Sequence, residues 1–323
     1  MSAALSVVLV TPDSYQRIRK TIQHLGRQTV KGLIEVVIGA PSLPELEPDQ
    51  AELSVFGAVK LVEVGLIRST GEPRAAALLR ATAPVVVFAE DHCWPEPGWA
   101  AALVDAHKQP WGGVGATLTN ANPCGTLSWA SFLLNFGPSV DRKSGGVTGS
   151  IPWHNSAYKA DLLRPYEKEL GSLLEAEGLL QAALEKNGHR LYLQAAARTA
   201  HVNVSISRSF FAEQFSGARL FWALRAEREG WPRTRRWAWA LAMPGLFVVR
   251  VGRALRETSR IGFPARRLPA LITVLCAGSL ALTVGAGAGI LFGRGGSLAR
   301  RIRLEFHRDE HVQANERNLW SDD

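Results

Sequence analysis

Short apolar runs alternate with amphipathic stretches through the N-terminal two thirds of the chain. The stretch after the first run, DSYQRIRKTIQHLGRQ, has apolar residues at helical spacing, with Asp13 or Ser14 as its N-cap. The apolar runs occupy residues 5–11, 34–41, 59–63 and 84–88, and RAAALLRATA before the last of them is helical. Runs that are apolar on both faces and separated by helices predict an α/β fold with a mostly parallel central sheet. Ligands in such folds lie at the carboxyl ends of strands, so chemistry is expected just after Phe88.

The pattern changes twice before residue 210. Residues 112–161 are rich in Gly, Ser, Asn and Trp and only weakly periodic, which indicates long loops and short strands that shape a pocket. Residues 171–186 are helical with a stop at Gly188, and LYLQAAARTAHVNV returns as extended chain. We therefore expect one domain over residues 1–210.

Two uncharged apolar segments follow. Residues 268–293 form the longest uncharged run, and a helix of this length reaches about 39 Å, enough to cross a hydrocarbon core of ~30 Å. This predicts a transmembrane helix, with a buried core helix as the alternative. Residues 237–249 are short for a span and include two tryptophans, which favours an interfacial or re-entrant segment within a basic region, 211–267, over a second span. Residues 294–323 are expected to form a polar tail.

The positive charge is concentrated in the same region. The whole chain carries +8, whereas the segment from Arg219 to Arg303 holds sixteen Arg, no Lys and three Glu, a balance of +13. Arginine beside an apolar segment predicts contact with anionic membrane lipids and argues against nucleic-acid binding. Gly285 and Gly289 form a GxxxG pattern, which permits a homodimer through the membrane helix. The arginines on both sides of 268–293 leave the membrane orientation undecided.

Cysteine usage and the N-terminus bear on the compartment. Cys93, Cys124 and Cys276 form no CxxC pair, so neither a disulfide framework nor a zinc site is expected. The N-terminal sequence MSAALSVVLVTPDS lacks a basic region and a long apolar run, so it is not a signal peptide. The domain over residues 1–210 is therefore expected to lie on the cytosolic side of the inner (cytoplasmic) membrane.

Polar residues end the fourth apolar run. In VVVFAEDHCWPEPGW, the residues Glu90, Asp91 and His92 follow a buried strand directly. Burying three such groups without partners is costly, which points to a ligand or metal, while a solvated strand end is the alternative.

At these residues the chain resembles the family 2 glycosyltransferases, the inverting enzymes of the GT-A fold, over roughly residues 4–205. In that family an Arg at the start of a helix is followed sixteen residues later by an Asp-x-Asp motif. Arg74 plus sixteen is Glu90 and plus eighteen is His92, so the motif here is EDH. Phe88 and Trp99 also occupy the family's places.

The resemblance implies a divalent metal that bridges the diphosphate of a nucleotide sugar. Glu90 is expected to face the ribose and the metal, and His92 to ligate the metal. Imidazole is a competent ligand for Mn²⁺, which makes Mn²⁺ favoured over Mg²⁺. His201 in AARTAHVN corresponds to a family histidine near the metal, with a structural role as the alternative. The implied donor contacts are Thr11, Pro12, Arg74, Glu90, Asp91 and Asn155.

A second motif, LLEAEGLLQAALEKNG, resembles the family's helix that carries the catalytic base eleven residues before a glycine. Glu177 lies eleven residues before Gly188 and is the expected base, with Glu175 as the competing candidate and an exposed helix glutamate as the structural alternative. An inverting transfer requires a carboxylate that removes the acceptor hydroxyl proton during in-line attack. His154 and Tyr158 are expected to line the pocket together with Asn155, or to serve packing.

Departures from the family pattern set limits. The Asp that the family has at the end of the second strand falls at Gly39 or Ala40 here. The family's Asn after Arg74 is Ala75, and its Glu before the catalytic base is Ala176. The Gln-x-x-Arg-Trp motif that is typical of processive enzymes is matched only in part, by Arg235-Arg236-Trp237. A polymer synthase is therefore not expected.

The sequence thus predicts a membrane-anchored, inverting glycosyltransferase acting on a lipid-linked or cell-envelope glycan acceptor. A catalytically silent membrane scaffold or binding subunit is the alternative, followed by a metal-dependent nucleotidyltransferase. A Rossmann dehydrogenase is excluded because no GxGxxG follows the first strand.

Overall fold

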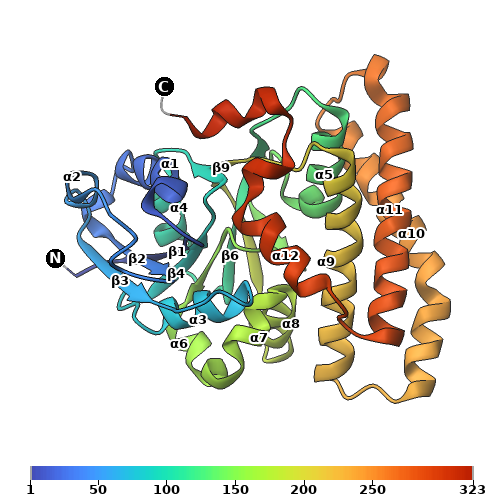
Figure 1. Ribbon diagram of the computed structural model, residues 1–323, viewed down its shortest axis with the longest axis horizontal. Helices are drawn as coiled ribbons and strands as arrows, with labels where there is room; N and C mark the ends of the chain where they lie inside the picture. Colours follow the sequence, from blue (N-terminus) through green and yellow to red (C-terminus); the bar gives the residue numbers. More distant parts are fainter. Residues whose placement is uncertain (1, 322–323) are drawn as a thin grey trace. The chain divides into compact units, whose positions relative to one another are not determined.

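A computed structural model describes residues 2–321. It consists of two compact units, one built around a sheet and one of long helices (Figure 1). The sheet unit comprises the residues up to Thr119, Asp141–His201 and those from Trp320 onward; the helical unit comprises Asn120–Val140 and Val202–Leu319. The division thus falls at residue 201 rather than 210, and residues 120–140, expected to shape a pocket of the first domain, belong to the helical unit.

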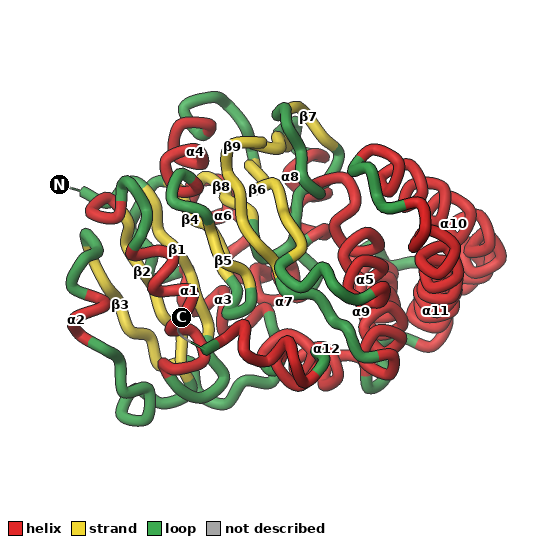
Figure 2. The backbone as a smooth tube through the Cα atoms, turned by 90° about the horizontal axis from the view of Figure 1, so that it is seen from above, coloured by secondary structure: helices red, strands yellow, loops and turns green. Residues whose placement is uncertain are grey.

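The described residues form one mixed sheet with strands in the order β3-β2-β1-β4-β8-β6-β9-β5, and β7 pairs with β9. The strands are β1 (Leu5–Val10), β2 (Ile34–Ala40), β3 (Ala58–Glu63), β4 (Val85–Ala89), β5 (Cys93–Pro95), β6 (Gly113–Asn120), β7 (Gly146–Thr148), β8 (Ser156–Lys159) and β9 (Leu191–His201). The first four in spatial order are parallel, as expected, whereas β8 is antiparallel to β4 and β6 to β8. Figure 2 shows the strands side by side. The strands β6 and β8 come from the stretch that showed no clear periodicity.

The helices of the described chain complete the element list. They are α1 (Tyr15–Gly26), α2 (Gln50–Leu53), α3 (Gly71–Leu78), α4 (Trp99–Ala106), α5 (Thr126–Phe136), α6 (Ala160–Leu163), α7 (Leu170–Glu175), α8 (Gly178–Lys186), α9 (Ser207–Arg228), α10 (Arg233–Arg260), α11 (Leu268–Phe292) and α12 (Ser297–Phe306). Short 3-10 turns lie at Lys31–Leu33, Gly137–Ser139, Arg164–Glu169, Ala265–Arg267, Arg308–His311 and Ala314–Trp320.

The core of the sheet unit follows from strands that are apolar on both faces. Every residue of β1, β2 and β4 is buried. Leu5, Val7 and Leu9 share one cluster with Ile18 and Ile22 of α1, while α3 packs against β1 and β2. A parallel sheet buried in this way holds its carboxyl strand ends in fixed positions, and these ends carry the candidate site.

Three long helices, α9, α10 and α11, lie side by side in the helical unit (Figure 1). Helix α9 runs parallel to α11, since a Cβ added at Gly278 would meet Phe210 and one added at Gly285 would meet Phe215. Helix α10 runs antiparallel to α11, with Arg236 donating to the Ile290 carbonyl at 3.1 Å. Helix α5 packs against α9 and α11, which explains why its residues join this unit.

The GxxxG pair is used inside the chain. A Cβ at Gly285 would lie 2.2 Å from the Phe215 carbonyl oxygen, and one at Gly289 would lie 2.2 Å from the Arg219 carbonyl oxygen. These glycines therefore allow α11 to approach the backbone of α9 closely. The pair is covered by α9, so a homodimer through this face would require the two helices to separate.

Both α10 and α11 are long and apolar enough to cross a membrane by length and composition, with mean hydropathy of 1.3 and 2.0 over an 18-residue window within Arg233–Arg260 and Ala265–Phe292. Residues 237–249 are part of the continuous helix α10, which passes through Pro244 and has 28 residues. The argument that this segment is too short to span therefore does not hold. The interfacial assignment itself stays a prediction.

The C-terminal residues are folded rather than a free tail. Helix α12 packs on α9, and Leu304, Phe306 and Val312 are buried. Further on, Trp320 belongs to the sheet unit, where its ring lies edge-on to that of Trp94 with centroids 6.0 Å apart. A polar composition thus does not keep this segment in solvent.

Candidate functional site

The EDH segment connects β4 to β5 and is buried throughout. The exposed fraction is 5% for Glu90, 5% for Asp91 and 0% for His92. Strand β5 pairs antiparallel with β9 in a register that places Cys93 opposite His201. This pairing brings His201, itself buried, beside the end of β4, although 108 residues of chain separate it from Cys93.

Glu90, His92 and His201 form a group of potential metal ligands within 4.8 Å of one another. The His92 Nε2 atom lies 3.8 Å from one Glu90 carboxylate oxygen, and the His201 Nε2 atom lies 3.6 Å from the other. The two imidazole rings meet edge to face with centroids 5.0 Å apart. These separations are longer than hydrogen bonds and leave space for a cation bound by nitrogen and oxygen atoms.

The tautomer of His92 is set by its neighbour. The Asp91 carboxylate lies 2.6 Å from His92 Nδ1, and a carboxylate in this position accepts the Nδ1–H hydrogen bond. The proton on Nδ1 leaves a lone pair on Nε2, and that buried atom has no hydrogen-bond partner. A carboxylate that orients an imidazole in this way is the usual outer support of a metal-ligating histidine. The residues present therefore fit a divalent cation.

A loop before β8 holds the Glu90 carboxylate from another side. Asn155 Nδ2 donates to a Glu90 oxygen at 2.5 Å, and His154 Nδ1 lies 3.4 Å from the other oxygen. The side chain of Thr21 donates to the Glu90 carbonyl at 2.9 Å, which fixes the backbone. His154 has a φ of 58°, in the left-handed region where glycine is favoured. Glu90 is thus oriented by contacts from three elements.

Glu177 is buried under the same loop. It lies at the start of α8 with 0% exposure, and its two oxygens accept hydrogen bonds from the His154 N–H and the Tyr158 hydroxyl, each at 2.5 Å. Burial raises the pKa of the Glu177 carboxyl, although the charge of His154 and these hydrogen bonds act in the opposite direction. Glu177 is therefore neither an exposed helix glutamate nor open to solvent.

Glu175 has a different partner. Its carboxylate accepts from the Thr70 N–H at 2.8 Å, the Thr70 hydroxyl at 2.8 Å and the Gly71 N–H at 3.0 Å. A Cβ at Gly71 would lie 2.0 Å from the Gly171 carbonyl oxygen, so only glycine permits this approach of α3 to α7. Glu175 binds the free N–H groups at the N-terminus of α3 and acts as a structural cap.

The remaining predicted donor contacts lie at the ends of β1 and the start of α3. Thr11 and Pro12 follow β1, whose register with β4 pairs Leu9 with Ala89, so they lie beside the EDH segment. The Thr11 hydroxyl donates to the Ser14 carbonyl at 2.7 Å. Arg74 is buried in α3, donates to the Thr70 carbonyl at 3.0 Å and lowers the pKa of Glu177 through its charge, although burial still raises that pKa overall.

At Gly39, one of the two positions where the resembled family has an Asp, the surroundings are apolar. A Cβ at Gly39 would contact Val10, Val64 and Ala77 at 3.4–3.5 Å. A carboxylate there would enter apolar surroundings without a donor, which is costly. The sequence departure at the end of β2 is therefore matched by the packing.

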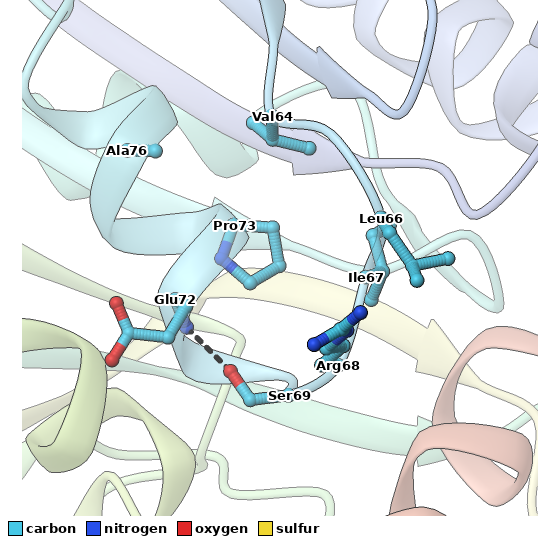
Figure 3. Close-up of a pocket in the computed structure, with 8 residues that line it drawn as sticks. All are labelled: Val64, Leu66, Ile67, Arg68, Ser69, Glu72, Pro73 and Ala76. Carbon is cyan, nitrogen blue, oxygen red and sulfur yellow. Dashed lines mark hydrogen bonds between the residues drawn. The ribbon is translucent and has the colours of Figure 1, made fainter.

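A pocket of about 480 Å³ lies between the end of β3 and the start of α3. Its walls are mostly apolar, with Arg68, Ser69 and Glu72 as polar members; all lining residues are Val64, Leu66, Ile67, Arg68, Ser69, Glu72, Pro73 and Ala76 (Figure 3). The Glu72 N–H donates to the Ser69 hydroxyl at 2.9 Å, and the Glu72 carboxylate lies next to Gly171.

The structure brings Glu90, Asp91, His92, Asn155 and His201 together, and their roles in metal and donor binding stay predictions. The sequence did not assign the contact of His154 to Glu90 or the capping role of Glu175. A histidine among the polar residues of IPWHN was the only signal for the first, and nothing local indicated the second.

Comparison with protein-family models gave no match, and comparison with curated proteins gave none either. Among solved structures, the chain is similar to the crystal structure of S. aureus TarS 1-349, with a TM-score of 0.46 and 15% identity over 90% of this chain and 91% of that one. The same protein in complex with UDP-GlcNAc gives a TM-score of 0.43 and 13% identity over 88% and 90%.

The crystal structure of GalNAc-T7 with UDP, GalNAc and Mn²⁺ gives a TM-score of 0.46 and 13% identity over 63% of this chain and 44% of that one. At TM-scores below 0.5 these likenesses carry no argument about activity or substrate.

Proposed function

We propose that the protein is an inverting, metal-dependent glycosyltransferase that moves a sugar from a nucleotide-sugar donor to a lipid-linked or cell-envelope glycan acceptor. The observation that carries this proposal is the group of Glu90, His92 and His201 at the carboxyl end of β4, with the unpartnered His92 Nε2 inside it. Two imidazoles and one carboxylate favour Mn²⁺ over Mg²⁺, whose usual ligands are oxygens.

The EDH spacing from Arg74 supports a nucleotide-sugar donor through its resemblance to family 2 glycosyltransferases. In this proposal Glu90, Asp91 and Asn155 hold and orient the metal end of the diphosphate site. Thr11, Pro12 and Arg74 lie at the neighbouring strand end and helix. The pocket beside Pro73 takes the nucleoside part, which replaces the base contact that Gly39, lacking a carboxylate, does not offer.

The reaction proposed is a single in-line displacement. The acceptor oxygen forms a bond to the anomeric carbon, the bond from that carbon to the diphosphate oxygen breaks, and the acceptor proton goes to the Glu177 carboxylate. Glu90, His92 and His201 would hold a divalent metal, whose charge would stabilise the negative charge that develops on the departing diphosphate.

Glu177 must change partners to act as this base. Tyr158 and the His154 N–H occupy its two oxygens. The acceptor hydroxyl therefore has to replace the Tyr158 hydroxyl at the carboxylate. Its raised pKa suits a group that takes up a proton during the reaction.

The membrane part of the proposal depends on the helical unit. Helices α10 and α11 are apolar and flanked by arginines, and a bilayer-bound enzyme meets a lipid-linked acceptor at high effective concentration. We place the protein at the inner membrane with its sheet unit facing the cytosol.

The occupied oxygens of Glu177 favour the second candidate, a catalytically silent scaffold or binding subunit that keeps the nucleotide-sugar site. The two candidates differ in turnover and share donor binding.

A donor screen tests both. Purified full-length protein is incubated with UDP-, GDP- and dTDP-sugars in Mn²⁺ or EDTA, and binding and hydrolysis are measured for wild type, His92→Ala and Glu177→Gln. The proposal expects Mn²⁺-dependent binding that His92→Ala loses, and turnover that Glu177→Gln loses while binding is kept. Binding without turnover in wild type supports the scaffold, and no binding of any nucleotide sugar overturns both.

A further inference from the structure

Helices α10 and α11 expose continuous uncharged stripes. On α10 the exposed positions recur at helical spacing along one side, and α11 shows the same pattern. The large exposed side chains are Trp237, Leu241, Val248 and Val249 on α10, and Leu280, Val284 and Phe292 on α11. Apolar stripes of this extent, on helices with arginine at their ends, fit a partner that is apolar inside and anionic outside.

Charged residues of the same unit lie beside the C-terminal half of α11. Gly285 of α11 lies against Phe215 of α9, and Gly289 lies against Arg219. Arg301 of α12 reaches Gly217, which lies between those two contacts along α9. Helix α12 therefore contacts the part of α9 that lies against the C-terminal half of α11.

An ion pair lies at this depth too. Arg308 donates to Glu213 at 2.8 Å, and both side chains are buried. Arg300 and Arg303 of α12 are exposed. If α11 crossed a bilayer from end to end, these exposed arginines would lie at the level of its hydrocarbon layer, where charged side chains are costly.

The C-terminal contacts exclude a single crossing. The Ser205 N–H donates to the His311 carbonyl at 3.1 Å, the Ser205 hydroxyl donates to Glu316, and His311 Nδ1 contacts the Ser209 hydroxyl at 2.9 Å. Residues before α9 and after α12 thus lie on one side of any membrane. A single span at 268–293 would separate them.

We propose that α10 and α11 lie together in the plane of one leaflet of an anionic phospholipid bilayer, with neither helix crossing it. The exposed stripes enter the interface, and the exposed arginines at the helix ends contact lipid phosphates. Those arginines are Arg233, Arg235, Arg253, Arg256 and Arg266. Helix α12 and the Arg308–Glu213 pair stay on the water side. This inference does not depend on the proposed enzyme activity.

The test measures depth in the membrane. Single cysteines are introduced by Ala270→Cys, Leu280→Cys and Phe292→Cys along the exposed side of α11 and by Leu241→Cys on α10, in a chain with Cys124→Ser and Cys276→Ser. The full-length protein carries a spin label at one site at a time and is bound to vesicles of equal parts phosphatidylglycerol and phosphatidylcholine. Accessibility to oxygen and to a water-soluble nickel complex gives the depth.

An in-plane hairpin places all four labels at a similar, shallow depth. A maximum at position 280 with shallow values at 270 and 292 overturns the proposal in favour of a span. Labels that never leave water overturn it too, and a concentration-dependent dimer would then assign the stripes to a second copy of the chain.

Vesicle flotation gives a second readout. Wild type is expected to bind vesicles of phosphatidylcholine alone about tenfold or more weakly than the anionic mixture, with the difference reduced by salt. Val248→Glu on α10 is expected to weaken binding to the anionic vesicles. The matched control Val147→Glu, at an exposed valine of β7, is expected to leave it unchanged. If the two variants bind the anionic vesicles equally, the exposed stripe of α10 is not the face that binds the membrane.

Discussion

Glu90 and Glu177 are both buried carboxylates of the sheet unit, yet their surroundings differ. The oxygens of Glu177 each accept a hydrogen bond at 2.5 Å. Glu90 accepts one such bond from Asn155, and it faces the Nε2 atoms of His92 and His201 across 3.8 and 3.6 Å. The first arrangement holds a loop in place through both oxygens, whereas the second leaves room for a ligand. Four predictions test this difference.

The largest effect is expected for His92→Ala. Loss of a nitrogen ligand should lower Mn²⁺ affinity by about 100-fold or more, since even outer-shell partners account for about 10–100-fold. Titration of the protein with Mn²⁺, followed by the signal of free Mn²⁺ in electron paramagnetic resonance, measures this. His107→Ala, a buried histidine outside the group, is the control. Unchanged affinity in His92→Ala would mean that the gap is not a metal site.

Glu177→Ala should cost stability instead of metal affinity. Two buried donors, the His154 N–H and the Tyr158 hydroxyl, lose their acceptor, which corresponds to about 2–4 kcal/mol of unfolding free energy. Urea unfolding followed by circular dichroism measures the change. In the matched variant Glu90→Ala the loss of unfolding free energy should be smaller, because the Glu90 carboxylate accepts one such hydrogen bond, from Asn155, instead of two. If Glu90→Ala is the more destabilising change, the contrast between the two carboxylates is wrong.

Glu175→Ala should have an intermediate effect. It removes the acceptor for three donors of Thr70 and Gly71, and loss of a helix cap costs about 1–2 kcal/mol. The same unfolding experiment applies, and Mn²⁺ affinity should stay at the wild-type value. A loss of turnover with full stability would instead identify Glu175 as the base.

The smallest effect concerns pH. Burial raises the pKa of Glu177 above its ordinary value of 4.5, so the folded state holds this proton more firmly than the unfolded state. The contribution of the group is therefore full below pH 4.5 and declines as the pH rises through the raised pKa. The stability of wild type relative to Glu177→Gln should fall over that range, in urea unfolding at several pH values. A difference that grows with pH would show a lowered pKa.

Local patterns predicted the parallel half of the sheet because strands such as β1 and β4 are apolar on both faces. They did not predict β6 and β8, whose residues alternate poorly and gain their order from antiparallel pairing with distant chain. The spacing from Arg74 located Glu90 and His92, but the pairing of Cys93 with His201 depends on a contact far along the sequence.

The helical unit shows another limit of local patterns. Counting only uncharged residues made 237–249 too short, although the arginines on both sides continue the helix and are good helix formers. The GxxxG pair indicated a close helix contact without identifying the partner, because small residues accept any neighbouring backbone. The structure identifies that partner as α9.

His154 bears on how such a protein could be redesigned. A histidine at a φ of 58° costs roughly 1–2 kcal/mol that a glycine would avoid. Glycine would also keep the backbone N–H that Glu177 accepts. A redesign that weighed backbone strain alone would therefore choose glycine at this position, and it would delete the imidazole beside Glu90.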